Sequence, residues 1–408
     1  MCKRLHSLEN QGLETYTGRV TSEDSQMSNM HIRYGIIGTG MMGVEHIESI
    51  LALDNTSVVA IADTDAGSRA EGRAHAGADC AVYEDYRDLL ADERVDAVVV
   101  VTPNFTHIDV MKDVIAAGKH VLCEKPLCTT AADCNTLIEL TVGYDGVVWV
   151  GLEYRYMPAV AALLDQVRSG FVGDIHMVAI REHRFPFLVK VDNWNRFSRN
   201  SGGTLVEKTC HYFDLMNLII GERPIQVFAS GGQNVNHLDE VYDGEKSDIL
   251  DNAYVIVDYP NGVRAMLDLC MFAEATKDQE ELSVVGNAGK LDARIPTSDL
   301  HLGTRSGEGV VDIGKVETRP ISNDRIRYEG LHHGASYLEH VDFAAAIRAH
   351  RAAGGGAVGA DAVDELGTLV SLEDGLWSVA IGQAAHRSIA ENRPVQLSEV
   401  LPGVRPPR

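Results

Sequence analysis

The sequence GTGMMG at residues 38–43 limits the possible folds of this chain more than any other feature. It follows an apolar run, Ile32 to Ile37, and it precedes residues whose apolar members recur at helical spacing. In a GxGxxG motif the glycines make a tight turn, let backbone approach a pyrophosphate and allow close packing of helix on strand. A second apolar run ends at Asp63, an acid twenty positions after Gly43. This order predicts a βαβ unit that binds a dinucleotide.

Asp63 also bears on which dinucleotide is bound. Its carboxylate would accept hydrogen bonds from a ribose diol and would repel a 2′-phosphate. Thr64 and Asp65 follow it directly, and neither is an arginine that could accommodate such a phosphate. NAD is therefore favoured over NADP as the cofactor.

Strand and helix patterns continue to alternate up to residue 150, which predicts a doubly wound parallel sheet. The run Ala97 to Val101 is apolar on both faces, as a central parallel strand requires. In such sheets ligands bind beyond the carboxyl ends of the strands. The site candidates by this rule are Thr102, Pro103, Asn104, Glu124 and Lys125.

Strand patterns dominate after residue 151, following one helical stretch that ends at Gly170. Asn261-Gly262 stands between two alternating runs and predicts a hairpin with a type I′ turn. Residues 287–289 indicate a second hairpin. The fold class predicted for the whole chain is α/β, with an N-terminal Rossmann domain and a C-terminal α+β domain.

The stretch SGGTLVEKTCHYFDLM, residues 201–216, predicts a helix that starts near Thr204. Glu207, His211 and Asp214 are spaced four and three apart and would share one helix face, with Lys208 pointing elsewhere. Burying ionisable groups costs several kcal/mol unless they are paired. We therefore expect this polar stripe to face a cleft, where it meets a ligand and water.

The motifs GTGMMG, TPNFTH, GKHVLCEKPL and GG…E…H…D occur in this order, and from about His31 almost to its end the chain resembles the Gfo/Idh/MocA family. Members are NAD(P)-dependent oxidoreductases of sugars and cyclic polyols such as inositol. The resemblance implies that Lys125 is catalytic, that a cis peptide bond precedes Pro126 and that His211 takes part in proton transfer. The family commonly has an aspartate that binds substrate hydroxyls where Glu207 stands. A glutamate there keeps the acceptor chemistry but leaves the substrate open.

The resemblance and the strand ends together give three sets of candidate residues. The catalytic set is Lys125, His211 and Glu207. The cofactor set is Gly38, Thr39, Gly40, Met41, Met42, Gly43, Asp63, Thr102, Pro103, Asn104, His107, Glu124 and Lys125. The substrate set is Lys125, Tyr154, Arg155, Asn193, Trp194, Glu207, Lys208, His211 and His333. Two alternatives stay open: Lys208 pairs with an acid of its own domain, and Asp214 is an orienting or structural partner.

The second domain of the family has an open, mostly antiparallel sheet with helices on one face. A second subunit is the simplest cover for the other face. The resemblance therefore implies a homodimer or homotetramer formed through the C-terminal sheet.

Length and charge narrow the remaining possibilities. A chain of 408 residues predicts two domains, here 31–150 and 151–408, after a polar extension at 1–30 that lacks a signal-peptide core. The net charge of -23 argues against nucleic acid and anionic membranes as partners, and no apolar run is long enough to span a bilayer. Seven cysteines, an odd number, indicate a reducing compartment and a cytoplasmic protein, and their spacing predicts no metal site.

The preferred hypothesis is thus an NAD-dependent dehydrogenase that oxidises a secondary hydroxyl of a sugar or cyclic polyol. A dinucleotide sensor without catalysis is the alternative from another class, and loss of Lys125 or His211 would have favoured it. An oxidoreductase acting on a non-sugar carbonyl is the third hypothesis, because a fold does not fix its chemistry.

Overall fold

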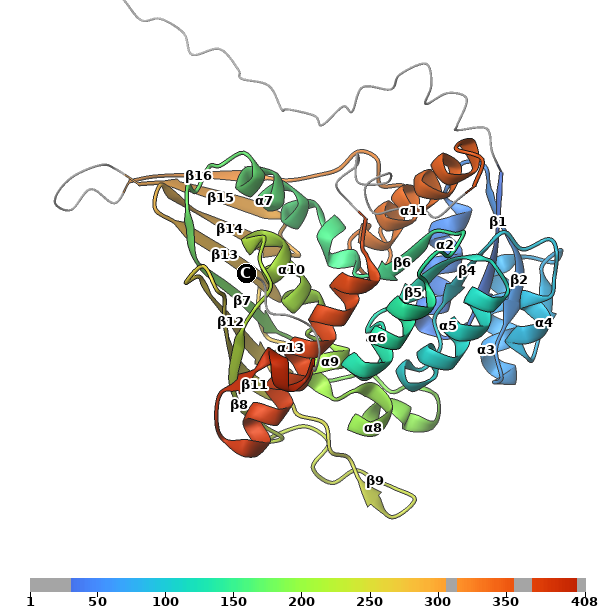
Figure 1. Cartoon of the computed structure of the whole chain (residues 1–408), viewed down its shortest axis with the longest axis horizontal. Helices are drawn as coiled ribbons and strands as arrows, with labels where there is room; N and C mark the ends of the chain where they lie inside the picture. The colour runs from blue at the N-terminus through green and yellow to red at the C-terminus, as the bar shows by residue number, and fades with distance from the viewer. Residues whose placement is uncertain (1–30, 306–313, 356–368, 402–408) are drawn as a thin grey trace, which may run out of the picture.

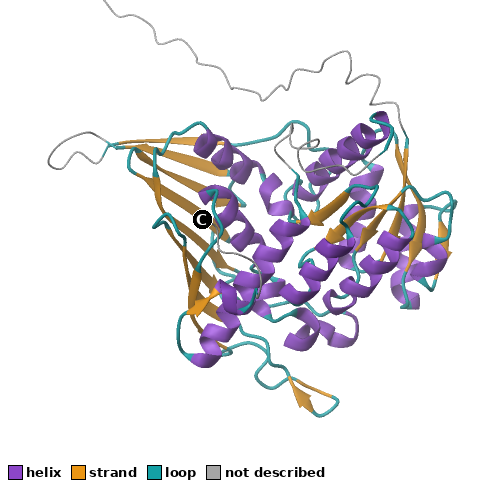
Figure 2. Cartoon of the chain, in the orientation of Figure 1, coloured by secondary structure: helices purple, strands orange, loops and turns teal. Residues whose placement is uncertain are grey.

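The computed structural model describes residues 31–305, 314–355 and 369–401. It contains a six-stranded sheet on the right of Figure 1 and a nine-stranded sheet on the left, with the helix α13 between them. Figure 2 shows that helices lie between the two sheets and also cover the far side of the smaller one. In the part of the chain that the structure describes, no helix is both long and apolar enough to cross a membrane.

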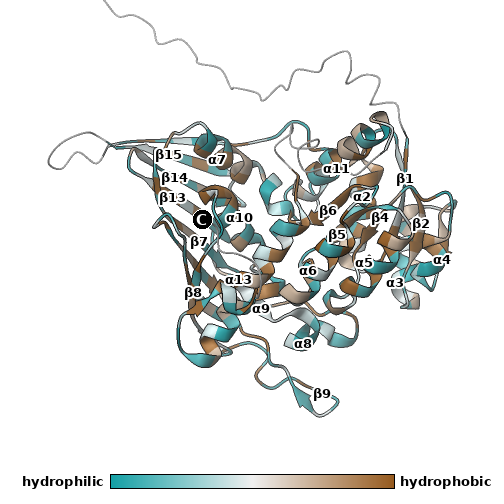
Figure 3. Ribbon diagram, viewed as in Figure 1, coloured by the Kyte–Doolittle hydropathy of each residue, from teal (hydrophilic) through white to brown (hydrophobic). Residues whose placement is uncertain are grey.

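The smaller sheet is parallel throughout, with strand order β3-β2-β1-β4-β5-β6. Its elements are β1 (Ile32–Ile37), α2 (Met41–Leu51), β2 (Thr56–Ala62), α3 (Ala66–Ala76), β3 (Ala81–Tyr83), α4 (Tyr86–Leu90), β4 (Ala97–Val100), α5 (His107–Ala116), β5 (His120–Glu124), α6 (Ala131–Leu140) and β6 (Val148–Gly151). Every residue of β4 is buried, and the central strands are largely apolar in Figure 3. The predicted doubly wound sheet is confirmed.

The larger sheet has the order β16-β15-β14-β13-β7-β12-β11-β8-β17, and its pairs are antiparallel except β7 with β12. Its strands are β7 (Ile175–His183), β8 (Gln226–Gly232), β11 (Asn252–Asp258), β12 (Arg264–Cys270), β13 (Glu280–Gly286), β14 (Gly289–Ile295), β15 (Asp299–Thr304), β16 (Lys315–Pro320) and β17 (Val395–Gln396). The helices α7 (Pro158–Arg168), α10 (Cys210–Ile220) and α13 (Leu372–Glu391) cover the face turned toward the smaller sheet. The expected mostly antiparallel sheet is confirmed.

The hairpin predicted at Asn261-Gly262 joins β11 to β12, but its turn is not type I′. A type I′ turn needs positive φ at both central residues. Pro260 stands at the first central position and holds φ negative. Only Gly262 has a positive φ, 82°. The turn is therefore a type I turn followed by glycine in the left-handed region, one of the common alternatives for hairpins.

The helix predicted from Thr204 is interrupted after one turn. α9 spans Thr204–Glu207, and α10 starts at Cys210 after a turn. In an unbroken helix the Glu207 carbonyl oxygen would accept the N–H of the residue four further on. Here this oxygen accepts a hydrogen bond from Nζ of Lys125 at 3.3 Å. The helix thus breaks where its backbone serves a lysine of the other domain.

The C-terminal helices return to the first domain. α11 (Ala335–Ala352) packs on α2, and α13 packs on α6 and β6. Backbone N–H of Val150 donates to the carbonyl oxygen of Val370 at 3.1 Å. The site between the two sheets is consequently enclosed by residues from both halves of the chain and from its last hundred positions.

Candidate active site

The glycine loop after β1 is shaped for close backbone contact. Gly38 has φ of 95°, and a Cβ on it would lie 2.5 Å from the Val101 carbonyl oxygen. A Cβ on Gly43 would lie 2.2 Å from the Gly38 oxygen, whereas a Cβ on Gly40 would meet nothing within 4 Å. Gly40 is also the N-cap of α2, and no side chain caps that helix. Uncapped N–H groups beside an open glycine fit the pyrophosphate of a dinucleotide.

Asp63 lies directly after β2, beside this loop. Its carboxylate accepts hydrogen bonds from the backbone N–H of Thr39 at 2.7 Å and of Asp65 at 2.8 Å. Arg69 donates to the backbone oxygens of Asp63 and Thr64. An acid at this strand end suits a ribose diol, while the nearby guanidinium is the one group here that suits a 2′-phosphate.

The peptide bond between Lys125 and Pro126 is cis, as the resemblance implied. Glu124, one residue earlier, accepts a hydrogen bond from Nε2 of His46 at 2.8 Å, and Nδ1 of His46 lies 2.8 Å from Nε2 of His340. The side chains of Glu124, His46 and His340 are all buried. Glu124 is therefore held by α2 and α11, and its other oxygen accepts the Lys125 N–H at 3.0 Å.

Two of the predicted cofactor residues, Asn104 and His107, connect loops in the structure. His107 is fully buried, and its two ring nitrogens lie 2.9 Å from the carbonyl oxygens of Pro126 and Thr102. The Asn104 side chain donates to the Ser201 carbonyl oxygen at 3.0 Å. Pro103 precedes Asn104 in this loop. His107 and Asn104 thus have polar contacts within the protein that hold these loops together, and their contact with a cofactor stays a prediction.

Thr39 likewise uses its side chain inside the protein, since its hydroxyl donates to the Ser68 carbonyl oxygen at 2.8 Å. Met41 is 44% exposed at the start of α2. Met42 is partly buried. These positions line the loop, and their backbone is what a pyrophosphate would approach.

Lys125 and Glu207 face one another across the two domains. Glu207 is 7% exposed, and its Oε2 has no hydrogen-bond partner among the described residues. Burial raises the pKa of Glu207 to about 7, against the opposing charges of Lys125 and Lys190. Burial works against the charge of Lys125, but the surrounding acidic groups, Cys210 and Glu153 foremost, raise its pKa. Lys125 is thus a cation next to a carboxyl group that titrates near neutral pH.

His211 is stacked on Tyr154, with ring centroids 3.9 Å apart and planes 5° from parallel. The imidazole is 1% exposed, and its Nδ1 has no hydrogen-bond partner among the described residues. Burial, followed by the charges of Lys125 and Lys208, lowers the pKa of His211 well below its usual value. His211 is therefore a neutral imidazole, which is the form that accepts a proton.

Lys208 pairs with an acid of its own domain, the alternative left open by the sequence. Its Nζ lies 3.0 Å from Oε1 of the fully buried Glu182 and donates to the Tyr154 hydroxyl at 2.7 Å. Burial lowers the pKa of Lys208, and the nearby charge of Arg184 acts in the same direction. Through Tyr154 this lysine fixes the ring on which His211 stacks.

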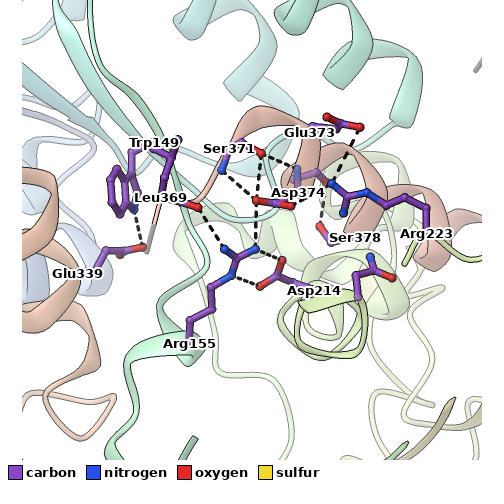
Figure 4. Close-up of polar contacts among 12 residues, drawn as sticks. Trp149, Arg155, Asp214, Arg223, Glu339, Leu369, Ser371, Glu373, Asp374 and Ser378 are labelled. Atoms are coloured by element: carbon purple, nitrogen blue, oxygen red, sulfur yellow. Dashed lines mark hydrogen bonds and ion pairs between the residues drawn. The ribbon is translucent and has the colours of Figure 1, made fainter. Parts of the chain in front are cut away.

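Arg155, which was predicted to bind substrate, forms a buried ion pair within the protein (Figure 4). Its guanidinium donates to both carboxylate oxygens of Asp214, at 2.7 and 2.5 Å, and to the Leu369 carbonyl oxygen at 3.3 Å. Asp374 lies 3.2 Å away. Arg155 therefore ties the segment after β6 to α10 and α13, and Asp214 is its structural partner.

His333 is exposed, with a positive φ of 54°, and its neighbour His332 lies beside Glu153. Nε2 of His332 lies 3.6 Å from Oε1 of Glu153. The sequence analysis missed both residues. Glu153 follows β6 by two positions, so the strand-end rule that selected Lys125 would have found it as well.

Asn193 and Trp194 lie in the 3₁₀ segment Val191–Arg196. Backbone N–H of Asn193 donates to the Lys190 carbonyl oxygen, and the side chain of Asn200 donates to that of Trp194. This segment adjoins Lys190, whose pKa burial lowers and Glu207 raises. The segment thus borders the site on the side of Glu207.

No cluster of three or more His, Cys, Asp or Glu side chains within residues 31–305, 314–355 and 369–401 is arranged to hold a metal ion. Cys123, Cys128 and Cys134 are buried free thiols.

Two sequence models of one family match the chain. Residues 32–152 match the oxidoreductase family GFO_IDH_MocA, NAD-binding Rossmann fold, and residues 165–397 match its C-terminal alpha/beta domain. The chain therefore belongs to the Gfo/Idh/MocA oxidoreductase family, with NAD as the cofactor of its Rossmann domain.

Relatives with established names extend over nearly the whole chain. The chain is 29% identical to myo-inositol 2-dehydrogenase of Thermotoga maritima over 91% of its own length and 100% of the relative. It is 27% identical to inositol 2-dehydrogenase of Rhizobium meliloti, over 90% of this chain and 100% of the relative. A levoglucosan dehydrogenase solved with NADH and levoglucosan superposes with a TM-score of 0.73, covering 90% of this chain and 99% of that one at 20% identity. At that identity the last comparison supports the fold alone.

Proposed function

We propose that this oxidoreductase is an NAD-dependent dehydrogenase that oxidises a secondary hydroxyl of a sugar or cyclic polyol. One observation carries the proposal. Between Lys125 and the segment before α11 lie buried polar atoms that have no hydrogen-bond partner in the described part of the chain. They belong to Glu153, Glu207, His211 and His332. Leaving such atoms unpaired costs about 1–3 kcal/mol each. A ligand with several hydroxyl groups would satisfy them together.

The cofactor supplies a hydride acceptor when it is bound. The chain supplies the proton chemistry. The neutral His211 accepts the hydroxyl proton, and the Lys125 ammonium stabilises the negative charge that develops on the oxygen. Glu207 accepts or donates a hydrogen bond to a further hydroxyl, since its pKa of about 7 leaves both forms accessible.

The names of the relatives favour a polyol over other alcohols. Two of them are inositol dehydrogenases that this chain matches over their full lengths. The site contains two carboxyl groups, those of Glu153 and Glu207, and both are nearly fully buried. Carboxyl groups that face a ligand are acceptors for vicinal hydroxyls, so a substrate with at least two free adjacent hydroxyls fits best.

NAD is proposed over NADP because Asp63 occupies the strand end. Replacing Asp63 by alanine should weaken NAD binding about tenfold or more, through the loss of hydrogen bonds to a charged acceptor. It should also allow Arg69 to contribute to NADP binding. Titration of nicotinamide cofactors by calorimetry measures both. Tighter binding of NADP than of NAD by the wild type would contradict this part of the proposal.

The central experiment follows the absorbance of reduced nicotinamide while inositols and aldoses are offered with NAD or NADP. Lys125→Ala should lower kcat about 10²- to 10³-fold, as expected for the loss of a group that stabilises an oxyanion. Lys112→Ala, an exposed lysine on α5, is the matched control and should retain wild-type rates. If no polyol reacts while NAD binds, a sensor or a non-sugar substrate becomes the better hypothesis.

The proposal includes a second copy of the chain on the outer face of the larger sheet. Phe228, Ile256 and Met266 are cross-strand neighbours on β8, β11 and β12, and they are 38%, 44% and 39% exposed. Adjacent exposed apolar side chains on a sheet favour coverage by another protein surface. A cytoplasmic location is also proposed, and the free thiols of the six described cysteines support a reducing compartment.

A further inference from the structure

Glu153 is a buried carboxyl group to which the sequence analysis assigned no role. It lies in the 3₁₀ segment Glu153–Tyr156 that follows β6, and its side chain is 2% exposed. Neither carboxyl oxygen has a hydrogen-bond partner among the described residues. Buried polar atoms are nearly always paired, so two unpaired oxygens on one side chain require an explanation.

Two histidines stand on either side of this carboxyl group. Oε1 of Glu153 is 3.6 Å from Nε2 of His211 and 3.6 Å from Nε2 of His332. The His211 side chain is 1% exposed, whereas that of His332 is 21% exposed. The three groups therefore lie in a row that leads from the buried imidazole of His211 to the partly exposed side chain of His332, whose Nδ1 is itself buried.

Resting on the proposed dehydrogenase function, we propose that Glu153 relays the substrate's hydroxyl proton from His211 to His332. The substrate C–H bond yields the hydride that reduces the nicotinamide, and the O–H bond yields the proton. That proton binds a ring nitrogen of His211 and moves to the Glu153 carboxylate. It then leaves through His332 to water, so the site returns to its starting charge. In the reverse reaction the proton travels the same path inward.

The separations of 3.6 Å are longer than hydrogen bonds, which measure about 2.7–3.2 Å. Hydrogen bonds that serve proton transfer are often long before ligands bind and tighten in the complex. A shift of about half an ångström on each side would bring both into range.

The charge state of Glu153 suits a relay. Burial, then the charge of Glu124, raise the pKa of Glu153 to about 8, while Lys125 and Lys208 lower it. Other titratable groups that face it are Cys210, Tyr154 and Glu339. A relay group must exchange its proton readily near working pH, and a carboxyl group with this pKa does so. Burial lowers the pKa of the receiving His332 to about 3, so His332 holds the proton only in passing. A purely structural carboxyl group would be expected to have a fixed partner instead.

The test compares wild type with Glu153→Gln and Glu153→Asp in both reaction directions across pH 6 to 9.5, roughly one to two units on each side of the expected pKa. Glutamine keeps the shape but carries no exchangeable acid. We expect Glu153→Gln to lower kcat about 100-fold with NAD affinity changed less than threefold, and aspartate to restore part of the rate. For the wild type, kcat for oxidation should rise with pH near 8 because the carboxylate must be ionised to accept the proton, and kcat for reduction should fall. Both trends should disappear in Glu153→Gln.

Glu280→Gln is the matched control, because Glu280 is another buried glutamate whose pKa burial raises, to about 7. It should retain the opposite pH trends of the two directions. Infrared spectroscopy gives a readout without turnover. A protonated carboxyl band with a midpoint near pH 8 should be present in wild type and missing from Glu153→Gln, while the bands of Glu207 and Glu280, with midpoints near pH 7, remain.

The outcomes separate this relay from the dehydrogenase proposal. If the wild type oxidises a polyol and Glu153→Gln keeps both its rate and its pH trends, the relay is wrong and the function stands. The relay would also be refuted if the carboxyl band with a midpoint near pH 8 remained in Glu153→Gln. If the wild type oxidises no polyol at all, the proposed function fails and the relay fails with it.

Discussion

Asp214→Asn tests whether Arg155 holds the scaffold or binds substrate. In the structure both oxygens of Asp214 accept hydrogen bonds from the guanidinium, and the two side chains are 1% and 9% exposed. Removing one partner of a buried ion pair leaves the other charge buried, at a cost of about 3–5 kcal/mol. Asp374, 3.2 Å from the guanidinium, remains as a partial partner. We therefore expect a loss of about 3 kcal/mol in the free energy of unfolding.

Thermal unfolding measures this loss. For a domain of this size, 1 kcal/mol corresponds to about 2–4 °C in Tm, so the variant should unfold roughly 6–12 °C below wild type. KM for the substrate should change little, because neither residue is proposed to contact it. The exposed pair Arg319 and Glu317 supplies the control, since Glu317→Gln should shift Tm by about 1 °C or less.

A drop in Tm of less than about 2 °C would refute the energetic argument for the Arg155 ion pair. A large rise in KM with an unchanged Tm would instead restore the original prediction that Arg155 binds substrate. The double replacement Arg155→Met with Asp214→Leu should recover much of the lost stability, because two apolar side chains leave no unpaired charge.

Three further predictions follow from the site and the sheet. Burial raises the pKa of Glu207 to about 7 from 4.5, so the folded protein binds a proton that the unfolded chain releases, and stability is lost as pH rises from about 4.5 to 7. Glu207→Gln should remove up to about 3 kcal/mol of that loss, which thermal unfolding at pH 5 and pH 8 will show; equal slopes in both proteins would contradict it. His46→Ala should lower kcat about tenfold with KM nearly unchanged, because Glu124 loses the hydrogen bond that positions it beside Lys125. Steady-state kinetics measure both constants, and a change confined to KM would contradict this role of His46. Ile256→Asp should convert an oligomer into monomers in light scattering, with Val241→Asp, exposed on the two-residue strand β9 (Val241–Tyr242), as control; an unchanged mass would move the interface elsewhere.

Local patterns were sufficient for the first domain because each of its features is short-range. The glycine loop, the acid after β2 and the all-apolar run of β4 lie within single βαβ units, so spacing along the chain predicts their neighbours in space. The strand-end rule selected Lys125 for the same reason. The same rule was not applied to β6, and Glu153 was missed there.

Residue identity alone did not give the partners of the charged groups, because those partners come from distant segments. Arg155 donates hydrogen bonds to Asp214, fifty-nine positions away, and Nε2 of His332, not of the exposed His333, lies 3.6 Å from Glu153. The predicted type I′ turn at Asn261-Gly262 was wrong for a local reason. Pro260 restricts φ at the first central position, and this restriction can be inferred from the sequence alone.

The sequence by itself determined the order of strands and helices, the dinucleotide loop and the family, and it selected Lys125 and His211 as the residues proposed to carry the chemistry. Tertiary structure decided which of these groups are charged and which are paired. It stacked His211 on Tyr154, turned the Glu207 carbonyl toward Lys125 and enclosed Glu153 between two histidines. The physical reason is that protonation and pairing depend on burial and on charges a few ångströms away, and those neighbours come from segments that folding alone brings together.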